Sequence, residues 1–357
     1  MLTLVRRYRL LTAVLAVVVA AAITAPLRGR TEPAAAAEIR RDTPSAVEKL
    51  HVPVTLAFAG DVHFEGALTN ALARDPAGVL APIAPVLRKA DVAVVNLETA
   101  ITTRGTAAVK TYTYRAPGSA FTALRTAGID AVSMANNHGL DFGSVGLVDS
   151  LAAANAAKFP IIGIGSNDAE AYRPYVATVR GQRIAVIAAT QVIDRRYLTA
   201  WTATQTTAGL ASAKEVERLT LAVREARKTS DTVVVYLHWG IEGAQCPSAA
   251  QRTLADELVT AGADVIVGSH AHVLQGAGRS GTAFVAYGLG NFAFYARGGL
   301  TTQSGVLTLT VTGRNVDTYA WSPAVIKAGV PTPLAGAPAQ AAVASWNALR
   351  ACTGLAP

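Results

Sequence analysis

The sequence predicts an α/β domain that begins near Val52, and two observations support this prediction. Short runs rich in β-branched residues alternate with segments of helical periodicity, as where "PVTLAFAG" is followed by "APIAPVLRKA". The 357 residues are 51% hydrophobic and 16% charged, which suits a sizeable core and excludes a disordered chain. Strands that alternate with helices in this way are typical of an α/β fold.

The alternation continues along the chain. The strand "DVAVVNLE", the helix "PGSAFTALRTAG" and the strand "IDAVSMANNH" come next, and "SLAAANAAKFP" leads to the apolar segments "IIGIG" and "RPYVATVRGQRIAVIAAT". The helix "SAKEVERLTLAVREARKTS", the strand "TVVVYLHWG", the helix "SAAQRTLADELVTAG" and the strand "ADVIVGSH" follow. The later segments "TAFVAYGLGNFAF" and "SGVLTLTVTGRNVDTYAWSPAVI" indicate antiparallel strands. We therefore expect one domain over residues 52–330, on which a C-terminal tail of residues 331–357 packs.

Residues 1–28 have a different pattern from the domain. Three arginines in "MLTLVRRYR" precede an uncharged run of 18 residues from Leu10 to Leu27. This pattern predicts either a cleaved signal peptide or a retained membrane anchor, because a spanning helix needs ~20 apolar residues. Residues 29–51 are rich in Ala, Pro and charge, which indicates a flexible linker. Both alternatives place the domain outside the cytoplasm, either anchored by the N-terminal helix or secreted.

The charge of the chain gives no reason to expect nucleic-acid binding. Lys and Arg number 32 against 24 Asp and Glu, a formal net charge of +8. Residues 1–30 contain five arginines and no acidic residue, so the remainder carries only +3 (27 against 24). A balance this small forms no broad basic surface by itself.

The two cysteines, Cys246 and Cys352, leave two possibilities open. In an oxidising compartment they permit one disulfide, which would tie the C-terminal tail to the loop after "HWGIEGAQ". Two free thiols are the alternative. Two cysteines are too few for a zinc-ribbon type of site.

Five of the six histidines lie at the end of an apolar, strand-like run. In open α/β sheets, ligands bind at the carboxyl ends of the strands. The runs "VTLAFAGDVH", "DVAVVNLE", "AVSMANNH", "TVVVYLH" and "VIVGSHAH" therefore bring a set of polar side chains to one edge: Asp61, His63, Asn96, Glu98, Asn137, His138, His238, His270 and His272. A single histidine is more often a structural residue than a ligand, but so many at equivalent positions predict a metal site.

The types and spacing of these residues predict the kind of metal site. Asp-x-His and His-x-His suit chelation, because residues i and i+2 of an extended segment point to the same side. Imidazole, carboxylate and amide ligands without thiolate favour zinc, manganese, iron or nickel. The ligands outnumber the needs of one tetrahedral ion and predict two divalent transition-metal ions, ~3.5–4 Å apart and bridged by a carboxylate. Such a site activates water for attack on a phosphorus or carbonyl centre.

The ordered motifs "GDVH", "NLE", "NNH", "HWG" and "GSHAH" resemble the signature of the calcineurin-like metallophosphoesterase superfamily. Together with "VVNLETAIT", "KTYTYRAP" and "YGLGNFAF", they are similar to its CapA branch, the bacterial capsule-synthesis proteins associated with poly-γ-glutamate. The resemblance spans about residues 54 to 295. It implies a four-layer α/β/β/α sandwich of the metallo-dependent phosphatase type, with two central sheets.

The resemblance also implies roles for individual residues. The ligands of one ion would be Asp61, His63 and His272. The ligands of the other would be Asn137, His238 and His270. Glu98 would bridge the ions, at a position where the superfamily has an aspartate. His138 would be the catalytic general acid, or alternatively a hydrogen-bond partner within the metal site. Asp141 would either orient His138 or cap the helix that follows.

Two departures from the family pattern stand out. Leu97-Glu98 replaces Gly-Asp, which makes the bridging side chain one methylene longer. The segment from Gly268 to His272 reads Gly-Ser-His-Ala-His, where the branch usually has Gly-His-His-Pro-His. Ser269 can still donate a hydrogen bond in place of the missing histidine.

Seven further side chains are candidates for substrate binding: Asn96, Lys110, Tyr114, Arg115, Trp239, Glu242 and Asn291. Lys110 and Arg115 lie in a segment where a cation can bind a carboxylate or phosphate, or form a surface ion pair. Trp239 and Glu242 line the cleft or pack the loop. Asn291 closes the floor of the site or satisfies a turn.

The resemblance implies an extracytoplasmic, metal-dependent hydrolase or transferase in capsule or poly-γ-glutamate metabolism. It would act on a phosphoester or amide bond, with metal-activated water and His138 as general acid. The expected partners are an anionic polymer or phosphoester substrate, the cell membrane through the N-terminal segment, and membrane proteins of capsule synthesis. Two alternatives stay open, namely a non-catalytic, membrane-tethered polymer-binding protein and a secreted phosphoesterase without a capsule role.

Overall fold

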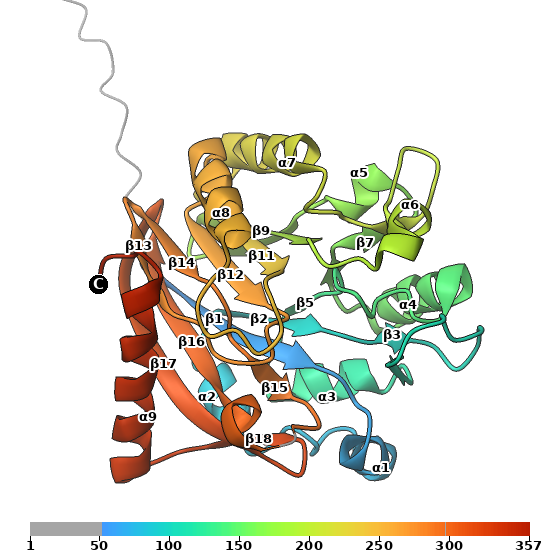
Figure 1. The fold of residues 1–357 in the computed structure, drawn as a ribbon, viewed down its shortest axis with the longest axis horizontal. Helices are drawn as coiled ribbons and strands as arrows, with labels where there is room; N and C mark the ends of the chain where they lie inside the picture. Colours follow the sequence, from blue (N-terminus) through green and yellow to red (C-terminus); the bar gives the residue numbers. More distant parts are fainter. Residues whose placement is uncertain (1–51, 297) are drawn as a thin grey trace, which may run out of the picture. The chain divides into compact units, whose positions relative to one another are not determined.

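Two β-sheets lie face to face in the computed structural model, which describes residues 52–296 and 298–357 (Figure 1). The first sheet has the order β18-β17-β16-β1-β2-β5-β6, with β15 also paired to β1. Its strands are β1 (Val54–Val62), β2 (Val92–Leu97), β5 (Ala131–Ser133), β6 (Ile161–Ile162), β15 (Asn291–Ala293), β16 (Gln303–Thr312), β17 (Asn315–Lys327) and β18 (Val330–Pro333). The segment from β1 to β6 is parallel and the segment from β16 to β18 is antiparallel, as the sequence predicted for its C-terminal part.

The second sheet has the order β13-β14-β12-β11-β9-β8. Its strands are β8 (Tyr175–Val179), β9 (Gln182–Thr190), β11 (Thr232–His238), β12 (Val265–Ser269), β13 (Ala277–Ser280) and β14 (Ala283–Ala286). The central strands are parallel, whereas β8 and β13 pair antiparallel at the two edges. Two short pairs lie outside the sheets: β3 (Ala100–Ile101) with β4 (Arg115–Ala116), and β7 (Ile164–Gly165) with β10 (Gly209–Leu210).

Alternation along each strand divides its side chains between two cores. In β1, Leu56 and Phe58 belong to the core between the sheets, whereas Ala57 and Ala59 face the helices. The outer face of the first sheet is covered by α1 (Ala67–Arg74), α2 (Ala84–Leu87), α3 (Ala120–Ala127) and α4 (Gly143–Ala157), and that of the second by α7 (Val216–Thr229) and α8 (Ala249–Ala261). These four layers confirm the predicted α/β/β/α sandwich.

Local signals in the sequence place the ends of the helices. Ser248 begins α8 with a capping box, in which its side chain and that of Gln251 each bond the other's backbone N–H. Gly262 ends the same helix at φ 113°, and Gly128 ends α3 at φ 92°, both in the left-handed region that glycine adopts without strain. The remaining short helices are α5 (Asp168–Ala171), α6 (Leu198–Trp201) and the 3-10 turns η1 (Arg195–Tyr197), η2 (Gly299–Thr302) and η3 (Leu349–Cys352).

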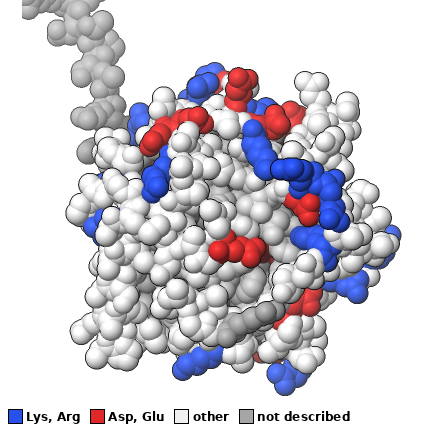
Figure 2. Space-filling model, in the orientation of Figure 1, with Lys and Arg blue, Asp and Glu red and all other residues white. Residues whose placement is uncertain are grey.

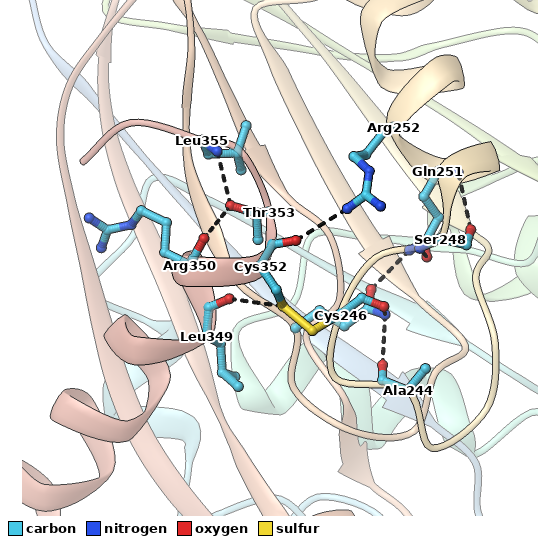
Figure 3. The surroundings of a disulfide bond; sticks show 11 residues. Ala244, Cys246, Ser248, Gln251, Arg252, Leu349, Arg350, Cys352, Thr353 and Leu355 are labelled. Atoms are coloured by element: carbon cyan, nitrogen blue, oxygen red, sulfur yellow. Dashed lines mark hydrogen bonds between the residues drawn. A yellow bond between two sulfur atoms is a disulfide. The ribbon is translucent and has the colours of Figure 1, made fainter.

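The C-terminal residues close one side of the core between the sheets. Helix α9 (Gly336–Ala348) packs along β17, and Trp346 stacks on Trp321 with their ring centroids 5.0 Å apart. Cys352 forms a disulfide with Cys246, with 5.6 Å between the Cα atoms (Figure 3). Of the two possibilities left open for the cysteines, the structure therefore contains the disulfide.

The predicted signal peptide or anchor (1–28) and the predicted linker (29–51) lie outside the described residues. Within residues 52–296 and 298–357, no helix combines the length and the apolar character needed to cross a membrane.

Candidate metal centre

The carboxyl ends of strands from both sheets meet at one edge. In the first sheet Asp61 lies opposite Asn96, and in the second His238 lies opposite Ser269. The two sheets are joined here by the Tyr236 hydroxyl, which donates to the carbonyl of Ala59 at 2.6 Å. The strand-end rule therefore brings polar side chains from distant parts of the sequence into one buried cluster.

Glu98 directly follows β2 and lies at the centre of this cluster. Its carboxylate is fully buried, and neither oxygen has a hydrogen-bond partner among the described residues. Its Oε1 lies 3.4 Å from Nε2 of His238, 3.9 Å from Nε2 of His138 and 4.0 Å from Nε2 of His272. Burial, together with the charge of Asp61, raises the pKa of Glu98 to about 8. A buried carboxylate requires a compensating charge, and the surrounding imidazoles are groups that ligate a cation.

Asp61 is also fully buried, but its oxygens are well partnered. Oδ1 accepts a hydrogen bond from Nδ2 of Asn96 at 2.8 Å, and Oδ2 accepts from the backbone N–H of His270 at 3.1 Å. Burial acts to raise the pKa of Asp61, but the hydrogen bond from His272 and the charges of His238 and His272 outweigh it and lower the pKa to about 2. Asp61 is therefore ionised at neutral pH, in the form that binds a metal ion.

His238 ends β11 and is fully buried among polar side chains. Its Nε2 lies 2.7 Å from Oδ1 of Asn137 and 3.1 Å from Nδ1 of His270. Its Nδ1 lies 3.0 Å from the hydroxyl of Ser269. Ser269 is the residue that stands where the family resemblance implies a histidine. Burial lowers the pKa of His238 to about 3 and that of His270 well below its ordinary value. Both imidazoles are therefore neutral, as ligation requires.

His270 and His272 follow β12 in a backbone conformation that is uncommon for their residue type. Their φ angles are 90° and 55°, in the left-handed region. Nδ1 of His272 lies 2.8 Å from Oδ1 of Asn291, which leaves Nε2 facing Glu98. Burial acts to lower the pKa of His272, but Glu98 and Asp61 outweigh it and raise the pKa to about 10.

Two groups of three ligand atoms lie within 4.8 Å of one another and could each hold a metal ion: Glu98 with His270 and His272, and Asp61 with Glu98 and His238. Glu98 belongs to both groups, as a ligand that bridges two ions would. The histidines are grouped differently from the two sets that the family resemblance implies. The assignment of each ligand to one ion therefore stays a prediction.

His63 lies beside the cluster rather than within either group. Its Nδ1 lies 3.1 Å from the backbone N–H of Glu65 and its Nε2 lies 3.4 Å from that of Tyr295, and a neutral imidazole can accept only one of these two hydrogen bonds. Its ring packs against Phe294, with centroids 3.8 Å apart. Burial, together with the charges of His138 and His272, lowers the pKa of His63 to about 3. A role for His63 as a metal ligand therefore stays a prediction.

His138 is held at the rim of the cluster by a charged pair. Its Nδ1 lies 2.6 Å from Oδ2 of Asp141, whose Oδ1 accepts from Nζ of Lys110 at 2.7 Å. The ring of Tyr114 stacks on the imidazole with centroids 4.0 Å apart, and its backbone N–H donates to Asp141 at 2.7 Å. Asp141 therefore orients His138, with Nε2 directed toward Glu98.

Comparison with known proteins places the chain in a family. A family model described as bacterial capsule synthesis protein PGA_cap matches residues 55–296. The chain belongs to this family. It is 33% identical over 175 residues to the capsule biosynthesis protein CapA of Bacillus anthracis, which covers 48% of this chain and 42% of that protein. It is also 34% identical over 172 residues to the PGA biosynthesis protein CapA of Bacillus subtilis (strain 168), and this alignment covers 48% of this chain and 44% of that protein.

A third relative of this PGA_cap chain is a probable polyglutamine synthesis accessory protein of Mycobacterium tuberculosis, 28% identical over 189 residues, covering 51% of this chain and 50% of that protein. The chain thus matches half or less of the length of these three relatives. Among solved structures, a hypothetical protein from Thermus thermophilus aligns with a TM-score of 0.48 and 16% identity, covering 76% of this chain and 100% of that one. The 5'-nucleotidase of Candida albicans aligns with a TM-score of 0.46 and 10% identity, and the alignment covers 83% of this chain and 58% of that one.

Two hollows open onto the candidate metal centre of this PGA_cap chain, and His138 lines both. The larger, of about 610 Å³, is also lined by Lys110, Asn137 and Arg196. The smaller, of about 270 Å³, reaches His272 and Asn291. A substrate in either hollow would therefore lie against the general-acid candidate.

Four of the predicted substrate-binding residues line these hollows. Lys110 lies in the larger, Tyr114 and Asn291 in the smaller, and Glu242 in both. Lys110 also donates to the carbonyl of Asn137 at 2.5 Å, so it braces the site as well as lining it. Asn291 hydrogen-bonds His272, which makes it a positioning residue for that ligand.

The other three lie elsewhere, which corrects their interpretation as substrate contacts. Asn96 is fully buried behind Asp61. Arg115 is exposed, and its guanidinium lies 4.9 Å from the ring centroid of Phe142, outside both hollows. Trp239 is fully buried and its indole N–H donates to the carbonyl of Tyr287 at 2.7 Å, so it packs the core behind the site.

Sequence reasoning missed several residues that shape the site. Asn136 is buried, donates to Oδ1 of Asn96 at 3.0 Å and accepts from the N–H of His138 at 3.0 Å. Its place beside Asn137 in "ANNH" was the available signal. Arg196 in η1 and the aromatic pair Phe294 and Tyr295 line the hollows, but no local motif marks them.

Proposed function

We propose that this chain is a divalent-metal-dependent hydrolase or transferase that acts on a capsule polymer of the poly-γ-glutamate type. The observation that carries the proposal is Glu98, a fully buried carboxylate without a hydrogen-bond partner among the described residues, amid histidine nitrogens. Membership of the PGA_cap family and the names of the relatives support the polymer class. The bond cleaved or formed is an amide or a phosphoester.

The residues present fit a metal centre of this kind. Asp61, Glu98, His238, His270 and His272 would hold the ions, with the amide oxygen of Asn137 beside them. Carboxylate and imidazole ligands of this kind suit zinc, manganese or iron. Bound divalent ions would lower the pKa of water and neutralise negative charge on the substrate.

The chain's own residues handle the proton. Asp141 accepts from Nδ1 of His138, which fixes the imidazole tautomer and keeps Nε2 available at the rim of the hollows. In the imidazolium form Nε2 also carries a proton, which can pass to a leaving group in either hollow and leaves the neutral Nδ1–H tautomer bonded to Asp141. Lys110 balances the charge of Asp141 and keeps that carboxylate in place. The stacked ring of Tyr114 holds the imidazole plane.

We further propose that the domain works outside the cytoplasm. The arginine-rich start and the uncharged run from Leu10 to Leu27 support export. The disulfide between Cys246 and Cys352 supports the same location, because such bonds persist mainly in oxidising compartments.

Elemental analysis combined with an activity screen tests the proposed function. The purified chain is expected to contain about two transition-metal ions and to act on either γ-glutamyl oligomers or phosphate esters. Removal of the metal by chelation should abolish turnover, and its return should restore it. Full activity of the metal-free protein would disprove the proposal. Metal binding with retained polyglutamate affinity but no turnover would favour a polymer-binding protein instead.

A further inference from the structure

The loop between β11 and α8 carries Glu242 and is fixed at three points. The N–H of Gly243 donates to the carbonyl of Ala271 at 2.8 Å, inside the His-x-His segment. Nε2 of Gln275 donates to the carbonyl of Ala244 at 2.8 Å. The disulfide of Cys246 then attaches the loop to the C-terminal η3 (Figure 3). Glu242 therefore projects from a braced backbone next to the candidate metal centre.

Glu242 is exposed, and no described residue forms a hydrogen bond or salt bridge with its carboxylate. An exposed glutamate without a partner is ordinary by itself. Its position is less ordinary, because Glu242 lines both hollows next to the metal centre. In its immediate surroundings the negative charge of Glu242 disfavours a carboxylate or phosphate and favours a cation.

The smaller hollow adds a second feature that favours a cation. Its wall contains four aromatic side chains: Tyr112, Tyr114, Phe294 and Tyr295. The faces of aromatic rings carry partial negative charge and attract ammonium groups. Tyr114 and Phe294 are buried, with their rings packed against His138 and His63, so a bound group would contact mainly Tyr112, which is 48% exposed. A carboxylate next to aromatic walls is the chemistry of ammonium recognition.

The larger hollow has a different character. Lys110 and Arg196 lie in its wall, and Asp194 lies 3.6 Å from Nε of Arg196. On the face shown in Figure 2, basic side chains gather on the side where Figure 1 places α4 and α6, while an acidic patch lies apart amid uncharged surface. Cationic and anionic groups of a substrate would therefore be drawn to different parts of the cleft.

We propose that the smaller hollow binds a free primary ammonium group of the substrate, with Glu242 as its counter-ion. This inference rests on the proposed function, because His138 lines both hollows and the reacting bond would lie between them. Carboxylates of the same substrate lie toward Lys110 and Arg196. Glu242 is then a specificity-determining residue that selects an amino-bearing chain end over the polyanionic interior of the polymer.

Binding of two synthetic probes tests this proposal without requiring turnover. The probes are γ-linked glutamate tetramers, one with a free amino terminus and one N-acetylated, measured by calorimetry on the full chain. Wild type, Glu242→Gln and the matched control Glu257→Gln are compared, with metal content determined in parallel. Glu257 lies on α8, is exposed and lines neither hollow, yet its replacement changes the net charge equally.

We expect wild type and Glu257→Gln to bind the free amine about ten-fold more tightly, which corresponds to about 1.4 kcal/mol. Glu242→Gln should lose most of this preference and keep its metal. Equal binding of both tetramers by wild type, no binding of either, or a preference that survives in Glu242→Gln would overturn the inference. Such results would leave the proposed function intact if chelation still abolished turnover, whereas metal-independent turnover would refute that function separately.

Discussion

Replacing Glu98 with glutamine is expected to stabilise the metal-free protein at alkaline pH while it weakens metal binding. Glutamine preserves the shape of the side chain but cannot ionise. In the metal-free protein, ionisation of Glu98 places a charge in a fully buried site without a hydrogen-bond donor among the described residues. Removing a buried charge of this kind stabilises a protein, whereas removing a metal ligand lowers metal affinity.

The magnitude follows from the pKa of Glu98, which is raised from 4.5 to about 8. Between these two pH values the native state retains a proton that the unfolded state has released, so stability falls as pH rises through this window. At about 1.4 kcal/mol per pH unit, the loss is on the order of 5 kcal/mol by pH 9. The attraction of His272 already enters the pKa of about 8 for Glu98, so the expected difference stays on the order of 5 kcal/mol.

Urea unfolding of chelator-treated wild type and Glu98→Gln, from pH 5 to pH 9, measures this difference. The two proteins should have similar free energies of unfolding near pH 5, and the variant should become the more stable as pH rises. Added metal should reverse the order, because an ion that binds only the native state stabilises wild type. Parallel pH profiles of the two metal-free proteins would refute the raised pKa of Glu98.

Three further predictions follow from the same geometry. His138→Ala should lower turnover by at least ~100-fold and leave the metal content unchanged; loss of metal in this variant would instead make His138 a ligand. Asn291→Ala removes the partner of His272 Nδ1 and should weaken metal affinity about 10–100-fold in chelator competition, and unchanged affinity would contradict its positioning role. Reduction of the disulfide between Cys246 and Cys352, which are 106 residues apart, should lower the free energy of unfolding in urea by about 2–5 kcal/mol. A change below ~0.5 kcal/mol would mean that the bond does not constrain the unfolded chain.

The strands and the edge where they meet could be predicted because both depend on local patterns. Alternation in β11 directs Tyr236 into the core between the sheets and Leu237 toward the helices. The same alternation places His238 in the site and Trp239 in the core behind the site, where Trp239 hydrogen-bonds Tyr287. A strict use of this alternation would have assigned Trp239 to the core from the sequence alone.

The position of His63 depends on a feature that no sequence motif marks. Asp61 and His63 were expected to point to the same side of an extended strand. The register of β1 with β15 shifts between Asp61 and Val62, which interrupts the regular alternation. His63 then packs against Phe294 and Tyr295, which lie far later in the chain. A bulge and such long-range neighbours are set by tertiary packing.

His270 and His272 approach Glu98, but not for the reason that the spacing suggested. An extended segment would have pointed both side chains to one side, whereas both residues adopt positive φ angles, 90° and 55°. Such a conformation costs about 1–3 kcal/mol per non-glycine residue and persists only where the surroundings impose it. Here Asp61 accepts from the N–H of His270, Asn291 contacts the ring of His272, and the carbonyl of Ala271 accepts from Gly243. The two sheets and the disulfide-linked loop thus hold a strained turn in place without an ion, so metal binding would need little rearrangement of the backbone.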